Sequence, residues 1–244
     1  MRRIQFSFSR LDALKHISHL DLMRLFQRAL RRSGLPLVYS EGYNPHMRFN
    51  LALPLPVNVT ASEEWGEVFL SADVTTGFFT QVLSEQIPEG LLLGKTKLAE
   101  LDAPLLPSLV SAAYYKASLQ AYDGRQPGFE QYHAALERLM AMNEILTAKK
   151  KKKQKKQSKQ KITYVNVRPF IIKAYFDQTE GADCTELKML LQAGNRGGIS
   201  PFFIVNCLEK DTGNYNGHSA YWQIHRESLY QGDNHILQPL FEGM

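Results

Sequence analysis

Three histidines near the start of the chain could transfer protons or contact phosphate. Lys15, His16 and His19 precede or begin a predicted helix, where free backbone N–H groups and the helix dipole favour an anion. His46 follows in the segment EGYNPHMR at 41–48. Three roles stay open: capping and packing, contact with phosphate or RNA, and acid–base catalysis of the metal-independent ribonuclease kind. In such catalysis one imidazole takes the 2′-hydroxyl proton and another protonates the leaving oxygen.

A basic stripe is predicted on the helix over 18–34. Arg24, Arg28 and Arg31 have the i, i+4, i+7 spacing of one helix face, opposite an apolar stripe. After Asp21 this helix has no Asp or Glu that could pair with them. Guanidinium binds phosphate oxygens in a bidentate way, so the stripe predicts a phosphate contact, and a solvated helix face is the alternative. The other cations expected beside the stripe are Arg10 and Arg32.

The segment at 41–48 carries more functional groups than a turn requires. Gly42 permits an unusual backbone, and Asn44-Pro45 fixes a bend. The stacking, titratable and charged groups beyond that need are Tyr39, Tyr43, His46 and Arg48. We predict that these side chains hold a nucleotide. If the bend lies at the same end of the sheet as His16 and His19, the two segments form one cleft.

Nine lysines gather in the tract at 149–161, and removing their charge from the net charge of +5 leaves −4 for the rest of the chain. The tract is either a solvated loop or a basic arm that binds RNA in a salt-dependent manner. Tyr164 and Arg168 lie beside it, and rings stack on bases. The residues predicted to bind nucleic acid are Arg24, Arg28, Arg31, Tyr39, Tyr43, Asn44, His46, Arg48, Lys151, Lys153, Lys156 and Arg168.

No metal site or cofactor is predicted in this chain. His16-x-x-His19 lacks a third ligand at a recognisable spacing. Cys184 and Cys207 lie far apart with no CxxC spacing, which is typical of small buried residues in a cytoplasmic protein. The sequence has no CxxxCxxC, P-loop, HExxH or GxSxG motif. No stretch approaches the roughly 18 apolar residues of a membrane helix.

The hydrophobic pattern predicts an α+β protein in which strands and helices alternate twice in the order β-α-β-β-α-β. This order is typical of two ferredoxin-like modules in tandem, each with an antiparallel sheet. We place the first module at 1–103 and the second at 104–244, with a lysine-rich hairpin or loop at 149–161. The tail at 231–244 is expected to fray. The predicted helices are 18–34, 75–87, 128–142 and 200–210, and the predicted strands are 3–11, 35–40, 49–57, 65–74, 91–101, 112–122, 171–178, 185–193 and 221–230.

The run HISHLDLMRLFQRALRRSGLPLVYSEGYNPHMRFNLALPLPV resembles the opening of the bacterial radical-SAM-linked proteins, a family with a domain of unknown function. The likeness is strong over about residues 2–70, and Asn166-Val167-Arg168-Pro169 resembles a later Asp-Leu-Arg-Pro of the family. Met47 stands where the family has Pro, and Asn58 where it has Gly. Members occur fused to, or encoded beside, a larger radical SAM protein, so the resemblance implies a bacterial cytoplasmic setting and such a partner.

The Gly-x-Asn-Pro turn before an Ala-Leu-Pro strand is also similar, more faintly, to the RAMP-type RNA-processing proteins of CRISPR systems, an analogy of fold only. We therefore predict an RNA-binding accessory that presents tRNA or rRNA to a radical SAM modification enzyme. The alternatives are a metal-independent endoribonuclease that uses His16, His19 or His46, and an adaptor that binds only protein. The sequence makes no prediction of oligomeric state.

Overall fold

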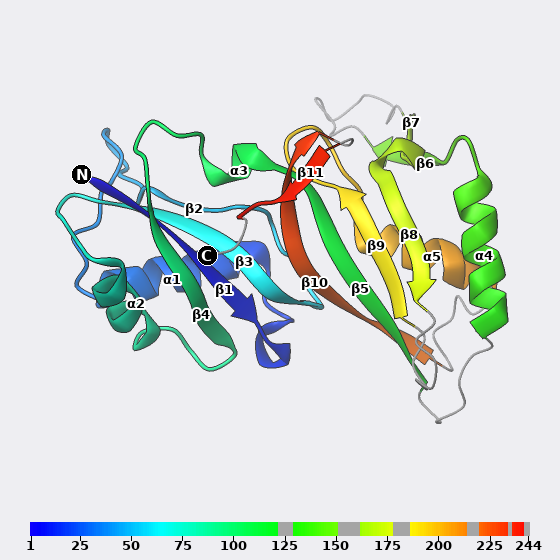
Figure 1. The fold of residues 1–244 in the computed structure, drawn as a ribbon, viewed down its shortest axis with the longest axis horizontal. Coiled ribbons are helices and arrows are strands. Elements are labelled where there is room, and N and C mark those ends of the chain that lie inside the picture. Colours follow the sequence, from blue (N-terminus) through cyan, green and yellow to red (C-terminus); the bar gives the residue numbers. More distant parts are fainter. Residues whose placement is uncertain (122–128, 151–161, 178–185, 214–219, 234–235, 242–244) are drawn as a thin grey trace, which may run out of the picture.

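One large, mostly antiparallel sheet runs through the protein in the computed structural model (Figure 1). The structure describes residues 1–121, 129–150, 162–177, 186–213, 220–233 and 236–241. The elements are β1 (Arg2–Arg10), η1 (Asp12–Leu14), α1 (His19–Arg32), β2 (Phe49–Leu51), β3 (Val59–Leu70), α2 (Thr76–Ser84), β4 (Leu91–Ala99), α3 (Leu106–Leu109), β5 (Val110–Ala121), α4 (Phe129–Ala141), β6 (Leu146–Lys150), β7 (Ile162–Asn166), η2 (Arg168–Phe170), β8 (Ile171–Asp177), β9 (Glu186–Gln192), α5 (Pro201–Asp211), β10 (Ala220–Asp233) and β11 (Ile236–Pro239).

The first half of the sheet has the order β4-β1-β3, with β2 paired to β3, and every pairing is antiparallel. Alternate residues of β1, namely Ile4, Phe6 and Phe8, are buried against α1 and α2. Helix α1 begins as predicted, because the Ser18 hydroxyl accepts a hydrogen bond from the Asp21 N–H (3.2 Å) and donates one to its carboxylate (2.7 Å). These local signals fix the helix that carries the basic stripe.

The second half has the order β10-β5-β9-β8, again antiparallel throughout. Its buried face packs against α4 and α5. The strands β6 and β7 form a separate two-stranded hairpin, which confirms the two predicted arms beside the lysine tract. The tract itself lies mostly outside the described residues.

The two halves share one sheet, whereas the sequence predicted two separate antiparallel sheets. The junction is a short parallel pairing of β3 with β10, from Val59 and Ile224 to Ala61 and Arg226. The core of the second half also contains Trp65 of β3. Pairings between segments so distant in the chain leave no trace in local periodicity, and for this reason the sequence could not predict the junction.

The prediction of a frayed tail at 231–244 is wrong for the described part of that tail. Strand β10 continues to Asp233, and β11 pairs with it. Leu240 is buried, and the ring of Phe241 lies 3.9 Å from that of Trp65. The C-terminal segment therefore helps to join the halves.

The predicted strands at 35–40 and 49–57 are longer than the observed ones. Only Phe49–Leu51 forms a strand, and the earlier segment contributes the isolated bridges Leu37–Leu70 and Tyr39–Met47. Prolines explain the short strand after residue 51, because Pro54 and Pro56 cannot donate to a ladder. The proline-containing segment after residue 51 therefore runs between the two halves instead of continuing the strand.

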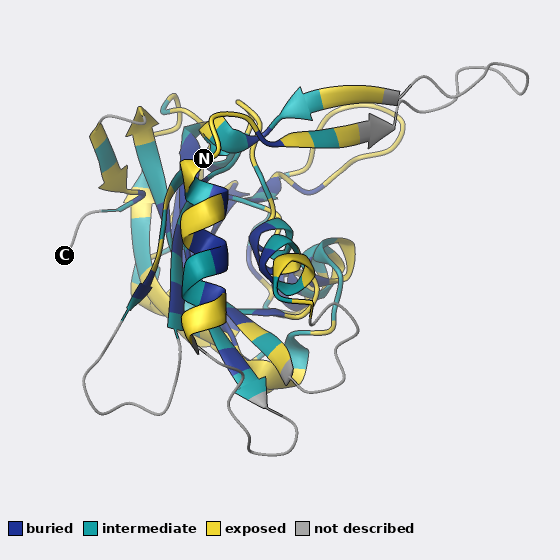
Figure 2. Cartoon of the chain, turned by 90° about the vertical axis from the view of Figure 1, so that its right-hand side faces the viewer, coloured by how far each residue is buried: buried dark blue, intermediate teal, exposed yellow. Residues whose placement is uncertain are grey.

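Helices α1 and α5 lie on one side of the sheet, behind it in the view of Figure 1, and the β6–β7 hairpin projects to that same side (Figure 2). We call this side the helical face. None of the described helices is long and apolar enough to cross a membrane.

Candidate nucleic-acid interface

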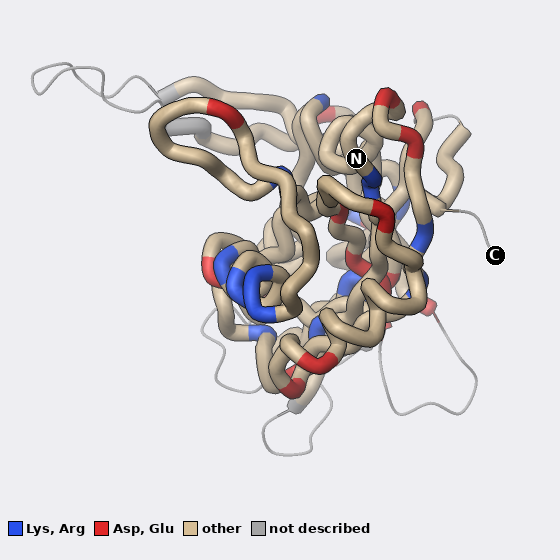
Figure 3. Tube along the Cα trace, turned by 90° about the vertical axis from the view of Figure 1, so that its left-hand side faces the viewer, with Lys and Arg blue, Asp and Glu red and all other residues tan. Residues whose placement is uncertain are grey.

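The arginine stripe of α1 lies on the helical face and is exposed (Figure 3). Arg24 forms an ion pair with Asp21 (3.2 Å). Arg28 and Arg31 have no hydrogen-bond or ion-pair partner among the residues that the structure describes. Arg32 donates to the side-chain and backbone oxygens of Gln86 (3.2 and 2.6 Å). Two of the predicted cations are therefore free to meet an anion.

The prediction that Arg10 extends this stripe is wrong. Its side chain is fully buried, and it donates hydrogen bonds to the carbonyls of Ile17 (3.3 Å) and Pro56 (2.5 Å), and to that of Val59 (3.1 Å from Nε). Burial lowers the pKa of the Arg10 guanidinium to about 10. Arg10 thus fastens the segment before α1 to the proline segment before β3.

The loop at 39–48 presents its polar groups to solvent. Tyr43 is fully exposed, and Asn44 and His46 are exposed as well. The loop is closed by its own backbone, because the His46 N–H donates to the Ser40 hydroxyl (2.9 Å) and buried Met47 anchors it. The exposed side chains of this loop therefore face solvent and do not contribute to packing.

Two further residues of the predicted interface have structural contacts. Arg48 stacks on the ring of Phe69, 4.1 Å from its centroid. Arg168 donates to the backbone carbonyls of Met140, Met142 and Ile171, each at 3.1 Å. Tyr39 is exposed. Lys151, Lys153 and Lys156 lie outside the described residues.

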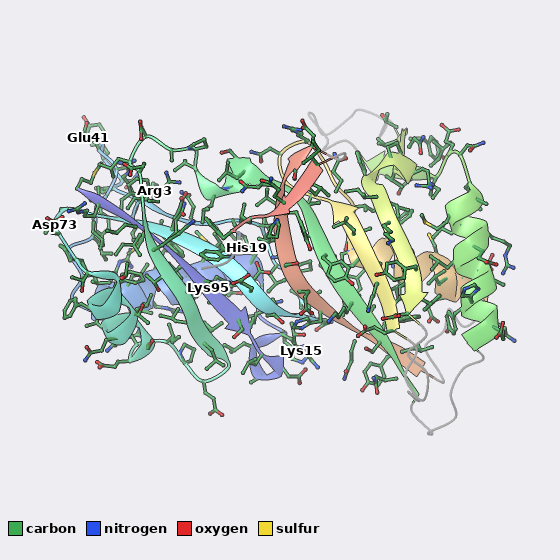
Figure 4. All side chains as sticks on the ribbon, viewed as in Figure 1. Arg3, Lys15, His19, Glu41, Asp73 and Lys95 are labelled. Carbon is green, nitrogen blue, oxygen red and sulfur yellow. The ribbon has the colours of Figure 1, made fainter. Side chains whose placement is uncertain are left out.

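The loop at 39–48 and the His16–His19 segment do not form the single cleft that the sequence suggested. Leu37 bridges to Leu70, which pairs with Arg2 at the start of β1. Ile17 contacts Arg10 at the other end of β1. A strand of nine residues is about 27 Å long, and Figure 4 shows Glu41 and His19 correspondingly far apart. The loop instead lies toward the C-terminal end of α1.

His16 lies in a cavity of about 710 Å³ at the junction of the halves. Its Nδ1 is 2.7 Å from the Asn58 Oδ1, and the Asn58 N–H donates to the Lys15 carbonyl (2.7 Å). Asn58 has φ +64°, a left-handed conformation that Gly adopts without strain and that Asn tolerates.

The sequence did not single out His225, which lines the same cavity. Its ring nitrogens are 2.8 Å from the Thr60 hydroxyl and 2.7 Å from the Ser62 hydroxyl. No motif in the strand at 221–230 distinguishes this histidine, since only the β3–β10 junction brings it to Thr60. The spacing of residues in the sequence therefore could not predict that a second histidine lies in the cavity of His16.

His19 lies in a different groove, of about 540 Å³, between the halves on the helical face. Its Nδ1 is buried and has no hydrogen-bond partner in the described structure. Because His16, His19 and His46 lie in three separate places, they do not form the acid–base pair that a ribonuclease would need. Within the described ranges, no group of three His, Cys, Asp or Glu side chains could hold a metal ion. Cys207 is partly buried, and Cys184 lies outside those ranges.

Two half-buried histidines predict an acid-labile fold. The pKa of His19 lies below its ordinary value because of burial and then because of Arg226 and Arg10. Burial also lowers the pKa of His225, although Glu227 opposes this and Lys116 adds to it. The unfolded chain binds these protons below about pH 6.5, and the folded chain binds them only at lower pH. Stability is therefore complete above that value, and we expect it to fall as the pH decreases below it.

Urea unfolding between about pH 5 and 7.5 measures this effect. The double variant His19→Gln/His225→Gln should show a flatter pH dependence than the wild type. His46→Gln, at an exposed side chain, is the control and should keep the wild-type profile. An unchanged slope in the double variant would contradict the assignment.

Comparison with known proteins gives a family for this chain. No match is found among the curated proteins. A family model described as an uncharacterized protein conserved in bacteria (DUF2344) matches residues 3–201, which include the arginine stripe, the exposed loop and the lining of the groove at His19, but not His225. Since this match covers most of the chain, the protein belongs to that bacterial family.

Proposed function

We propose that this protein is an RNA-binding accessory. The observation that carries the proposal is a pair of exposed arginines on α1, Arg28 and Arg31, which have no hydrogen-bond or ion-pair partner within the described ranges. Helix α1 lies on the face to which the β6–β7 hairpin projects (Figure 3). Unpaired guanidiniums on one face suit a polyanion better than water, because each can bind phosphate oxygens in a bidentate way. The hairpin arms lead into the lysine tract, which would add affinity that falls with salt.

The exposed rings on this face favour RNA with unpaired bases. Tyr43 is fully exposed in the loop at 39–48, and Tyr164 is 63% exposed on β7. Sequence-tolerant binding of single-stranded RNA combines such rings with a cationic track for the backbone. An adaptor that binds only protein would need an acidic partner and leaves the rings unexplained.

The partner in this proposal is a radical SAM modification enzyme in the bacterial cytoplasm, to which the protein presents tRNA or rRNA. Support comes from the resemblance of about residues 2–70 to the radical-SAM-linked proteins. We also propose that the halves are two ferredoxin-like modules. The matching strand orders β4-β1-β3-β2 and β10-β5-β9-β8 support this duplication.

We expect the double variant Arg28→Glu/Arg31→Glu to bind RNA about tenfold more weakly or worse, because two phosphate contacts become repulsive. The slope of log K against log salt should shrink by about 1.4, or 0.7 for each lost contact to a single strand. Fluorescence anisotropy with labelled tRNA between about 50 and 200 mM salt measures both quantities.

The matched control is Arg138→Glu/Lys95→Glu, which changes the net charge equally at exposed sites away from α1. Equal affinities of the two double variants would mean that the stripe is a solvated helix face. Incubation of the same RNA with EDTA, followed by a search for 2′,3′-cyclic phosphate ends, tests the ribonuclease alternative. Binding without any salt dependence would favour the adaptor.

A further inference from the structure

Among the residues that the structure describes, no carboxylate lines the groove between the halves, where His19 lies. Its volume of about 540 Å³ falls within the roughly 300–1,000 Å³ typical of small-molecule sites. Part of the lining is apolar and includes Leu53, Pro54, Pro56, Pro107 and Tyr115. The other polar groups in the lining are neutral, among them Gln192, Asn195 and Ser200. A flat ring could lie against this apolar part, and nothing in the lining would repel an anion.

Two buried arginines lie behind this lining. Arg226 donates to the carbonyls of Leu53 (3.2 Å) and Pro54 (3.0 Å), which line the groove, and it is paired with Glu64. The hydrogen bonds of Arg10 go only to backbone carbonyls within the described structure. One buried positive charge therefore has no carboxylate in direct contact, and its field reaches the groove through a medium of low dielectric.

His19 lies between these arginines and the groove. Both arginines contribute to the lowered pKa of its ring, which keeps the imidazole neutral near pH 7. A buried polar atom without a partner is unfavourable, and such atoms often mark a place that a water or ligand completes. The Nδ1 of His19 is an atom of this kind.

The lining also contains the loop at 194–200, whose glycines pack closely on neighbouring backbone. A Cβ on Gly198 would lie 2.4 Å from the Gln192 carbonyl, and a Cβ on Gly194 would lie 2.2 Å from the Val110 carbonyl. Ser200 follows as the N-cap of α5, but its hydroxyl makes no capping hydrogen bond, whereas the hydroxyls of Ser18 and Thr75 do. The Ser200 hydroxyl is therefore available to a molecule in the groove.

We propose that this groove binds one unstacked nucleotide of the RNA, with its base against the apolar part of the lining and its phosphate toward Ser200 and His19. The assignment rests on the proposed function. His19 is also the first residue of α1, so Arg28 lies about 14 Å further along the same helix. His19 lies on the side of α1 opposite the arginine stripe, so an RNA strand on the stripe would pass around the first turn of the helix to reach the groove.

The test uses the full-length protein and the four 5′-mononucleotides, with the matching nucleosides and inorganic phosphate as partial probes. Ser200→Asp keeps a good N-cap, because Asp caps a helix about as well as Ser, and it places a carboxylate where the phosphate would lie. We expect this variant to bind mononucleotides about tenfold more weakly or worse than the wild type. Thr75→Asp makes the same kind of change at the N-cap of α2, away from the groove, and should bind like the wild type.

The results separate this inference from the proposed function. Loss of tRNA binding in Arg28→Glu/Arg31→Glu with mononucleotide binding retained would show two distinct contributions, as we expect. A wild type that binds none of the four mononucleotides, or a Ser200→Asp variant that binds them undiminished, would overturn the groove assignment even if tRNA still binds. If the wild type binds mononucleotides but not tRNA, the groove is still a nucleotide site. The RNA-binding role of the protein would then be wrong, and so would the assignment of the groove to a nucleotide of RNA.

Discussion

We expect Arg226→Met to lower the free energy of unfolding by about 3–5 kcal/mol. Arg226 is fully buried, and its guanidinium forms a two-point pair with the buried carboxylate of Glu64. Burial acts to lower the pKa of Arg226, but Glu64 and Tyr115 together more than offset this, so that the pKa is raised overall. Met preserves much of the side-chain volume but leaves the Glu64 charge buried and unpaired, together with the carbonyls of Leu53 and Pro54. Urea unfolding at neutral pH measures the loss.

The double variant Arg226→Met/Glu64→Leu shows whether the loss of stability comes from the missing attraction between the two charges or from the unpaired carboxylate of Glu64. Replacing both members of a buried pair by apolar residues is often close to neutral, so we expect the double variant to recover most of the stability. Lys116→Met, which removes one member of a half-exposed pair with Glu227, is the control and should cost much less. A loss in Arg226→Met no larger than in Lys116→Met would show that Glu64 does not depend on its partner.

The same double variant connects the junction with function. Arg226 comes from the second half, whereas Leu53 and Pro54 belong to the first. A folded double variant would lack the bonds that hold these carbonyls at the groove. Mononucleotide binding should therefore remain weak in it even where stability returns.

Local signals in the sequence were sufficient to predict helix α1. The Ser18–Asp21 capping box, the apolar stripe and Gly34 predicted a helix over 18–34, and the structure has His19–Arg32. The helical periodicity of the apolar residues also predicted that Arg28 and Arg31 are exposed. Such features depend on residues a few positions apart, which the sequence shows directly.

Features that depend on distant contacts were not predictable in this way. Arg10 follows Ile4, Phe6 and Phe8 at alternate positions of β1, and a charged side chain at the end of such a series is expected to reach solvent. It is instead covered by the segments around Ile17, Pro56 and Val59. The apolar residues of ILQPLF at 236–241 could have indicated that the tail is ordered, because Leu240 and Phe241 pack where the halves meet.

The candidate sites differ in the same way, because one depends on local spacing and the others depend on distant contacts. The residues of the basic stripe could be identified from spacing on one helix. The cavity of His16 and His225 lies where β3 meets β10, and the groove at His19 lies between the segment at 51–56 and residues of the second half, so both draw residues from both halves. A single sequence carries no local pattern for such pairings.

We expect Glu67→Ala to be as damaging as Arg226→Met, with a loss of about 3–5 kcal/mol. Glu67 and Arg3 are both fully buried, with Oε2 of Glu67 accepting from the Arg3 Nε (3.0 Å) and Nη2 (2.5 Å). The other carboxylate oxygen accepts from the Asn50 side chain (3.0 Å) and from the Leu106 N–H (3.3 Å). One carboxylate thus joins β1, β2 and β3 to the start of α3.

Arg3 continues this network into the link between the halves, because it donates to the carbonyls of Glu100 (3.1 Å), Ala103 (2.6 Å) and Pro104 (2.7 Å). Loss of Glu67 would leave the Arg3 cation buried against carbonyls alone. Asp73→Ala breaks the exposed pair of the neighbouring Arg2 and is the matched control, which should change stability far less. If Arg3→Met/Glu67→Leu were no more stable than Glu67→Ala in urea, the loss would come from the hydrogen bonds to Asn50 and Leu106 rather than from an unpaired charge.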